Sequence, residues 1–176
     1  MVTIIFEAHG TTLDNEAHLA SGHNDVELSE LGIEQAKQLG ERYKDKPLNA
    51  VFCSDLQRAY ETAEIAFRGR AVAIVRDARL RECDYGDWTK KPSGEVEAER
   101  KNRITVPFPN GESYEDTNAR MKDFLDELKQ NYDGKTVMII GHRATQYGLE
   151  CWINGVPILT AVTAPWKWQA GWRYQY

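Results

Sequence analysis

Two short apolar runs, each ending at a neighbouring glycine and histidine, constrain the fold of this chain more than any other feature. Residues 2–7 lead through Ala8 to His9 and Gly10, and residues 136–140 lead to Gly141 and His142. Short β-branched runs that stop at glycine are typical of buried parallel strands. Ligands of open parallel sheets bind beyond the carboxyl ends of the strands, where two imidazoles can converge on one substrate. The sequence therefore favours an enzyme.

Strand-like and helix-like segments alternate along the rest of the chain. Ser29 is a suitable N-cap for a helix, Ser54 or Asp55 for a second, and Ser113 with Asp116 resembles a capping box. The expected strands are 2–7, 50–53, 72–75 and 136–140, and the expected helices are 30–44, one after residue 55, 113–131 and 143–153. This alternation predicts an α/β fold, a three-layer sandwich with a mostly parallel central sheet flanked by helices and right-handed crossovers.

Two segments fall outside this alternation. Residues 77–112 are polar and rich in proline and glycine, which predicts an irregular lid or wall with a short helix near 93–101 that governs substrate choice. In residues 166–176 aromatic side chains alternate with polar ones, which predicts one edge strand or a small hairpin whose aromatic side covers the core. A ligand-stacking aromatic face is the alternative.

Composition narrows the classes of function. The net charge of −5 argues against a nucleic-acid partner, although a local cluster of arginine and histidine can still bind an anion. Cys53, Cys83 and Cys151 are widely spaced, as in a reduced intracellular protein. We find neither a signal-peptide pattern nor a long apolar run, so we expect a cytoplasmic protein without a membrane partner. The sequence is compatible with a homodimer and does not determine the oligomeric state.

Several further strings accompany the two histidines in a fixed order. They are HGTTLDN at 9–15, SDLQRAYETA at 54–63, LRECDYGDW at 80–88, PNGES at 109–113 and GH at 141–142. Their order and spacing resemble the histidine phosphatase superfamily, also called the phosphoglycerate-mutase-like family, from about residue 3 to about residue 150. The resemblance implies a single histidine-phosphatase-like domain over residues 1–176.

The resemblance also implies roles for individual residues. His9 matches the nucleophile that becomes phosphohistidine, and His142 matches the second histidine, which donates to the phosphoryl group. Arg58 matches the phosphate-binding arginine, whose planar fork can hold two oxygens. Glu82 matches the proton donor, a role that requires a carboxyl able to hold its proton near neutral pH. Asn15 matches a polar residue of the phosphate pocket.

Position 8 departs from the family signature Arg-His-Gly. Ala8 stands where the signature has arginine, and Glu7 precedes it where the pattern is usually apolar. Arg143 directly follows His142, and two interpretations of it remain open. It supplies the missing phosphate contact, or it pairs with a surface acid or with Glu7. If Glu7 is the partner that neutralises Arg143, phosphate binding becomes doubtful.

Three functions follow from these residues. The first is a metal-independent phosphomonoesterase that acts on a small phosphorylated metabolite and needs no cofactor, with activity reduced by the absent arginine. A mutase is less favoured because the segment between Glu82 and Gly111 is short for a large lid. The second is a non-catalytic relative that binds a phosphorylated ligand or a protein partner. The third and weakest is a metal hydrolase that uses His9, His18, His23 and Asp25, whose spacing matches no recognised ligand motif.

Overall fold

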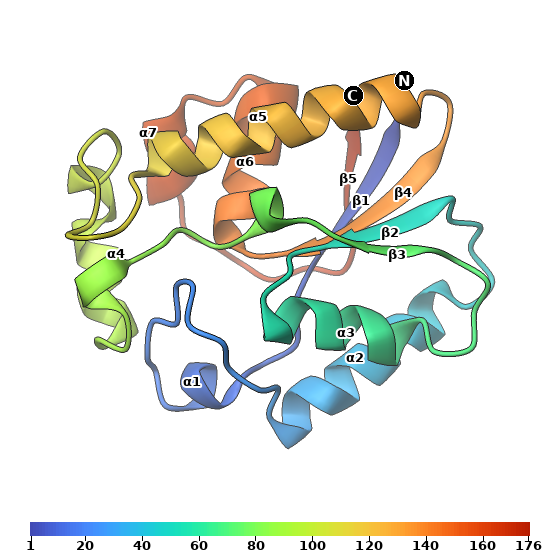
Figure 1. The fold of residues 1–176 in the computed structure, drawn as a ribbon, viewed down its shortest axis with the longest axis horizontal. Helices are drawn as coiled ribbons and strands as arrows, with labels where there is room; N and C mark the ends of the chain where they lie inside the picture. Colours follow the sequence, from blue (N-terminus) through green and yellow to red (C-terminus); the bar gives the residue numbers. More distant parts are fainter.

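The computed structural model describes residues 1–176 and contains a five-stranded sheet with the strand order β3-β2-β4-β1-β5 (Figure 1). The strands are β1 (Thr3–Ala8), β2 (Ala50–Cys53), β3 (Ile74–Arg76), β4 (Thr136–Gly141) and β5 (Trp172–Gln175). The four strands β1 to β4 pair in parallel, whereas β5 pairs antiparallel with β1 at the edge. The predicted mostly parallel sheet is confirmed.

Helices cover both faces of this sheet, which confirms the three-layer arrangement (Figure 1). On one face, α2 (Glu30–Tyr43) and α3 (Gln57–Ala66) pack on Ile5, Val51 and Met138. On the other, α5 (Tyr114–Asn131) and α6 (Arg143–Asn154) pack on Ile4 and neighbouring strand residues. Alternate residues of each strand face opposite layers, so both faces of the sheet are buried and apolar.

The segment predicted to be irregular contains one short helix, α4 (Ser93–Glu99), and single helical turns at Ala78–Leu80, Gly86–Trp88 and Arg100–Asn102. The capping box at the start of α5 is confirmed, because Ser113 Oγ accepts from the Asp116 N–H at 3.1 Å and Asp116 Oδ2 accepts from the Ser113 N–H at 2.8 Å. No helix of the structure is long and apolar enough to cross a bilayer.

Two local predictions were wrong, the N-cap of the helix after residue 55 and the bounds of the third strand, and two short helices were not predicted. The first residue of α3 is not capped by Ser54 or Asp55, because the N–H of Gln57 donates to the distant Asp25 carboxylate at 3.0 Å. Two short helices, α1 (Leu13–Glu16) and α7 (Ile158–Thr163), occupy segments without a helical pattern. The strand in 72–75 begins two residues later and ends at Arg76.

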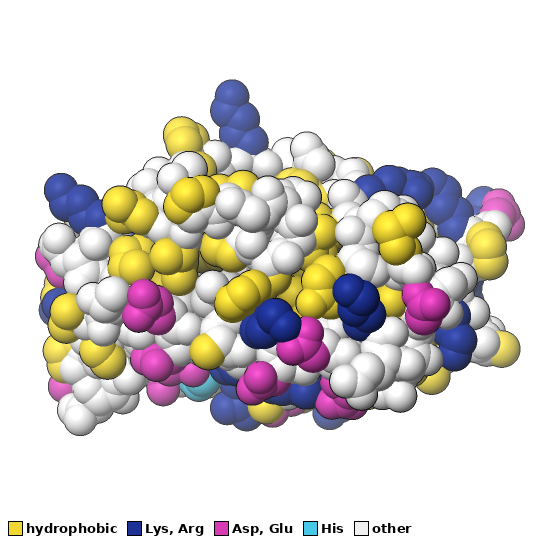
Figure 2. Space-filling model, turned by 90° about the horizontal axis from the view of Figure 1, so that it is seen from above, with side chains coloured by type: hydrophobic (Ala, Val, Ile, Leu, Met, Phe, Trp, Pro, Cys, Tyr) yellow, Lys and Arg dark blue, Asp and Glu magenta, His cyan; other side chains and the backbone are white.

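The aromatic tail divides into two parts. Residues 172–175 form the single edge strand β5, with Tyr174 4% exposed and Trp172 packed on the core, which confirms the prediction for this part. Trp166 and Trp168 lie outside the strand, and Trp168 is 56% exposed. Seen from the α5 side, the molecular surface mixes hydrophobic, basic and acidic side chains (Figure 2).

The loop after β1 lies so close to the start of α2 that two glycines are required there. A Cβ at Gly32 would stand 1.9 Å from the Thr11 carbonyl oxygen, and a Cβ at Gly10 would stand 2.6 Å from the Gly32 carbonyl oxygen. The Ser29 N–H donates to the same Thr11 carbonyl at 2.9 Å. The start of α2 therefore fixes the backbone that follows His9.

We expect Gly32→Ala to destabilise the protein by about 1–3 kcal/mol, because the added methyl group overlaps the Thr11 carbonyl and forces the backbone apart. Urea denaturation followed by circular dichroism measures the free energy of unfolding. Gly94→Ala is the control, since nothing lies within 4 Å of its Cβ position in α4. Equal stability of the two variants would contradict the close approach.

Candidate active site

The two histidines meet because β1 and β4 are neighbouring parallel strands. Their register pairs Ala8 with Gly141, and the His9 N–H continues the ladder by donating to the Gly141 carbonyl at 3.1 Å. The imidazole ring centroids lie 5.0 Å apart with an interplanar angle of 55°. Two residues that are far apart in sequence thus present their rings to the same space at the carboxyl edge of the sheet.

That space is an open cavity of about 650 Å³. Its lining includes every residue that the sequence singled out for catalysis or phosphate binding: His9, Asn15, Arg58, Glu82, His142 and Arg143. The structure therefore brings the six candidates to one cavity, in which convergent polar groups offer a site for a small ligand.

The His9 ring is held in one tautomer. Its Nδ1 lies 2.7 Å from the Gly10 carbonyl oxygen, which can only accept, so Nδ1 carries the proton and Nε2 keeps its lone pair. Burial, together with the nearby Arg58 cation, lowers the pKa of His9 to about 3. The ring is therefore neutral at physiological pH and has a nitrogen available as a nucleophile.

His142 is the N-cap of α6 and is 2% exposed. Neither of its ring nitrogens has a hydrogen-bond partner within the protein. Burial and the Arg58 cation keep the pKa of His142 well below its ordinary value. Its backbone is fixed by the N–H, which donates to Thr145 Oγ1 at 3.0 Å. The ring can thus offer one donor and one acceptor to a ligand.

Arg58 lies in the first turn of α3 and is 2% exposed. Its guanidinium donates to the carbonyls of Asn24 at 3.1 Å and Gly22 at 2.8 Å, and not to Glu61 or Glu64 on its own helix. Burial lowers the pKa of Arg58, although arginine remains protonated in proteins. Because its partners are neutral carbonyls, the positive charge is left for an anionic ligand.

Thr62, one turn further along α3, ties Arg58 to the loop that carries His9. Its hydroxyl donates to the Arg58 carbonyl at 2.7 Å and accepts from the Gly10 N–H at 3.0 Å. This residue lies in the quoted string at 54–63, but the sequence assigned it no role. A hydroxyl one helical turn after the arginine is the signal that points to it.

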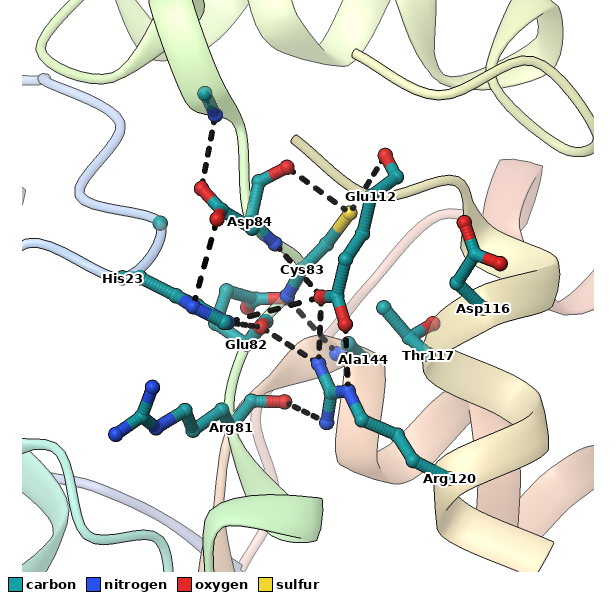
Figure 3. A network of polar contacts seen from close by, with 12 residues as sticks. His23, Arg81, Glu82, Cys83, Asp84, Glu112, Asp116, Thr117, Arg120 and Ala144 are labelled. Atoms are coloured by element: carbon teal, nitrogen blue, oxygen red, sulfur yellow. Dashed lines mark hydrogen bonds and ion pairs between the residues drawn. The ribbon is translucent and has the colours of Figure 1, made fainter. Parts of the chain in front are cut away.

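Glu82 reaches the cavity from the segment that follows β3. Its Oε1 accepts from the Cys83 N–H at 2.8 Å and from the Ala144 N–H at 3.3 Å, so it bonds to the first turn of α6 (Figure 3). The carboxyl is therefore oriented by the same helix that begins at His142. Two backbone donors leave its second oxygen for the ligand.

Asn15 and Arg143 have partners within the cavity wall. Asn15 is exposed, and its Oδ1 accepts from the Thr12 N–H at 3.0 Å in the capping box of α1. Arg143 pairs with Glu97 at 2.7 Å and lies over the Trp166 ring, 5.0 Å from its centroid. Arg143 thus both lines the cavity and pairs with an acid of α4.

Glu7 does not pair with Arg143, which corrects one of the two interpretations. Strand alternation turns Glu7 toward α2, where Oε1 accepts from the Tyr43 hydroxyl at 2.8 Å and lies 3.5 Å from Arg42 Nη2. Glu7 is 1% exposed, and burial raises its pKa. Ala8 lines the cavity, so the position of the signature arginine opens into free space.

The sequence did not assign Trp166, Trp168 or Arg42 to the site. All three line the cavity, and the Arg42 guanidinium lies 5.8 Å from the Trp168 ring centroid. The expectation that this part of the aromatic tail covers the core was wrong, and the ligand-facing alternative fits its position. Only long-range folding brings these residues to the carboxyl edge of β1.

The four residues of the metal hypothesis do not form a cluster. The structure contains no group of three or more His, Cys, Asp or Glu side chains that could hold a metal ion. His18 is exposed, whereas His23 donates from Nε2 to the Glu82 carbonyl at 2.8 Å and Asp25 accepts from the start of α3. These contacts give His23 and Asp25 structural partners.

Comparison with known proteins identifies the family. The sequence pattern of the histidine phosphatase superfamily, branch 1, matches residues 4–167. The chain belongs to this superfamily. The family match, together with relatives that are named phosphatases, places the chain among enzymes of the phosphatase or mutase type.

Individual relatives cover most of the chain. A probable phosphoglycerate mutase of Erwinia tasmaniensis is 32% identical over 165 residues, which span 89% of this chain and 77% of the relative. An uncharacterized phosphatase of Bacillus subtilis is 32% identical over 155 residues, 88% of this chain and 79% of the relative. The solved structure of a mycobacterial glucosyl-3-phosphoglycerate phosphatase complexed with VO3 is similar to this chain, with a TM-score of 0.82 and 26% sequence identity. The match covers 93% of this chain and 87% of the chain in that structure.

We expect His9 to remain uncharged between pH 8 and pH 5, because its folded pKa is about 3 whereas an unfolded histidine titrates near 6.5. Its ring proton resonance, assigned by its loss in His9→Asn, should not shift over this range. Below about pH 6.5 only the unfolded state takes up this proton, so the stabilising contribution of neutral His9 is complete above pH 6.5 and is lost progressively toward pH 3.

The free energy of unfolding should therefore fall less steeply between pH 6.5 and 5 in His9→Asn than in the unmodified protein. A ring resonance of His9 that shifts with a midpoint near pH 6.5 would contradict the neutral imidazole.

Proposed function

We propose that this protein is a metal-independent phosphomonoesterase that hydrolyses a small phosphorylated metabolite through a phosphohistidine at His9. The observation that carries the proposal is the orientation of His9. Gly10 holds the proton on Nδ1, which leaves Nε2 free beside the buried Arg58 cation and the unpartnered ring of His142. A neutral nucleophile next to a cation and hydrogen-bonding groups suits attack on a phosphate monoester.

In the first step, Nε2 of His9 attacks phosphorus and the bond from phosphorus to the ester oxygen breaks. Glu82 in its acid form gives its proton to the leaving oxygen, which departs as an alcohol, and Glu82 becomes a carboxylate. Phosphorylated His9 carries a positive ring, which the hydrogen bond from Nδ1 to the Gly10 carbonyl stabilises. Arg58 and His142 bind the phosphoryl oxygens.

In the second step, water attacks the phosphoryl group and gives a proton to the Glu82 carboxylate. The bond between phosphorus and Nε2 breaks, inorganic phosphate leaves, and neutral His9 and protonated Glu82 are regenerated. One water is consumed and no oxidant, reductant or metal takes part. Asn15 and Arg143 line the same cavity and contribute polar contacts to the bound phosphate or its leaving group.

We expect the protein to release phosphate from members of a panel of phosphorylated metabolites in the presence of EDTA, and His9→Ala to release none. Brief incubation with a reactive phosphoryl donor should label His9 with a phosphate that acid removes and base does not, because phosphoramidates have this stability. Phosphate release and radiolabel retention measure the two outcomes. Label that survives acid, or that persists in His9→Ala, would falsify the phosphohistidine step.

We expect Ala8→Arg to raise kcat/KM by about tenfold or more, because removing one preorganised charged donor typically costs about 10²–10³ in rate. The side chain enters the open space beside Ala8 and adds a forked donor to the phosphoryl oxygens. Ala8→Met is the matched control, since it fills similar space without charge.

An increase in both variants would attribute the effect to filled volume and not to charge. No gain from Ala8→Arg, combined with no turnover by the unmodified protein on any substrate, would favour the non-catalytic alternative, in which the cavity binds a phosphorylated ligand or a protein partner.

A further inference from the structure

His23 lies at the centre of a polar network behind Glu82 (Figure 3). Its Nε2 is 2.8 Å from the Glu82 carbonyl oxygen, which can only accept, so Nε2 carries a proton and donates. Its Nδ1 lies 3.6 Å from Asp84 Oδ2, and its Nε2 lies 3.6 Å from Glu112 Oε2. The ring is therefore directed at the backbone of the candidate acid, with a carboxylate on each side.

Arg120 of α5 holds the same backbone from the opposite direction. Its guanidinium donates to the carbonyls of Arg79 at 2.7 Å, Arg81 at 2.8 Å and Glu82 at 2.8 Å. It also grips both oxygens of Glu112 at 3.0 Å. A lysine could not form this set of contacts, because they require the planar fork and several donors of arginine.

Glu112 is the third residue that holds the backbone around Glu82. Its Oε2 accepts from the Asp84 N–H at 3.0 Å, so the residue after Cys83 is tied to the same carboxylate that Arg120 grips. The Glu82 carbonyl consequently has two donors, His23 and Arg120, and its flanking peptides are fixed on both sides. These contacts from His23, Arg120 and Glu112 restrict the position from which the Glu82 side chain enters the cavity.

We propose that His23 is a positioning residue that aims the Glu82 carboxyl at the leaving oxygen of the substrate. This inference rests on the proposed function, in which Glu82 donates the proton as the phosphorus–oxygen bond breaks. His23 does not touch the substrate itself. It acts through the Glu82 backbone, and the hydrogen bonds from Cys83 and Ala144 to Oε1 transmit the orientation to the carboxyl.

The effect of His23 is confined to proton donation because the neighbouring phosphate contact is made by the main chain. The carbonyls of Gly22 and Asn24, on either side of His23, hold Arg58. Loss of the imidazole leaves both carbonyls in place. Removing the ring should therefore impair departure of a poor leaving group while phosphate binding and attack by His9 continue.

Two substrates of nearly the same size separate these effects. The p-nitrophenolate ion leaves p-nitrophenyl phosphate readily without a proton, whereas p-nitrobenzyl phosphate must release an alkoxide and depends on the acid. We expect His23→Leu to lower kcat/KM for p-nitrobenzyl phosphate by about tenfold or more, within the contribution of general acid catalysis. For p-nitrophenyl phosphate we expect a change of less than about threefold.

His23→Gln is the rescue variant, since its amide nitrogen can replace Nε2 as the donor to the Glu82 carbonyl, and it should recover most of the lost activity on p-nitrobenzyl phosphate. His18→Asn is the matched control for the loss of an exposed imidazole from the same loop region, and it should leave both rates unchanged. Thermal unfolding of all variants shows whether the fold is retained. Equal losses on both substrates, or no recovery in a folded His23→Gln, would overturn the proposal.

A measurement without turnover separates this inference from the proposed function. The N–H groups of Cys83 and Ala144 donate to Glu82 Oε1, so their hydrogen exchange reports how firmly the carboxyl is held. We expect faster exchange at both amides in His23→Leu and not in His18→Asn. Unchanged exchange refutes the positioning role, whereas faster exchange in a protein without phosphatase activity supports positioning and refutes the proposed reaction.

Discussion

The parallel pairing of β1 with β4 is the interaction on which the site depends. Their register places Ala8 opposite Gly141, so that both strands end at the same level and the residues that follow carry the two imidazoles. A shift of one residue in either strand would exchange the faces of its side chains and bury polar groups in the apolar layers. The core residues of both strands thus determine where His9 and His142 lie, although neither histidine contributes to the core.

A second constraint is electrostatic. Arg58 is buried with neutral carbonyl partners and forms no ion pair, and its charge acts on imidazoles that are themselves desolvated. Burying an incompletely compensated cation is unfavourable, and so is burying the two ring nitrogens of His142 without a partner from the protein. Under the proposed function, a phosphate monoester relieves both costs, because it supplies negative charge to Arg58 and hydrogen-bonding oxygens to His142. The same arrangement therefore favours an anionic ligand.

The order of strands and helices could be predicted because it depends on local sequence patterns. Apolar runs that stop at glycine marked β1 and β4, and Ser113 with Asp116 marked the start of α5. The failures involve contacts between distant residues. Asp25 rather than a local side chain accepts from the start of α3, and Trp166 reaches the cavity from beyond α7. The histidines and Arg58 lie in recognisable strings, whereas the wall of the cavity is assembled by folding and has no local signature.

The charged residues around Ala8 are largely paired. Arg42 has Glu7 as a partner and Arg143 has Glu97, so each of these cations is already accompanied by an acid. Glu7 also lines the cavity, but its carboxyl is held by Tyr43 and Arg42 and burial raises its pKa, which limits the repulsion that it exerts on an anion. What Ala8 removes is therefore a direct forked contact more than the overall attraction of the pocket. Attraction of the anion then depends chiefly on Arg58, whose two carbonyl partners hold it in place without neutralising it.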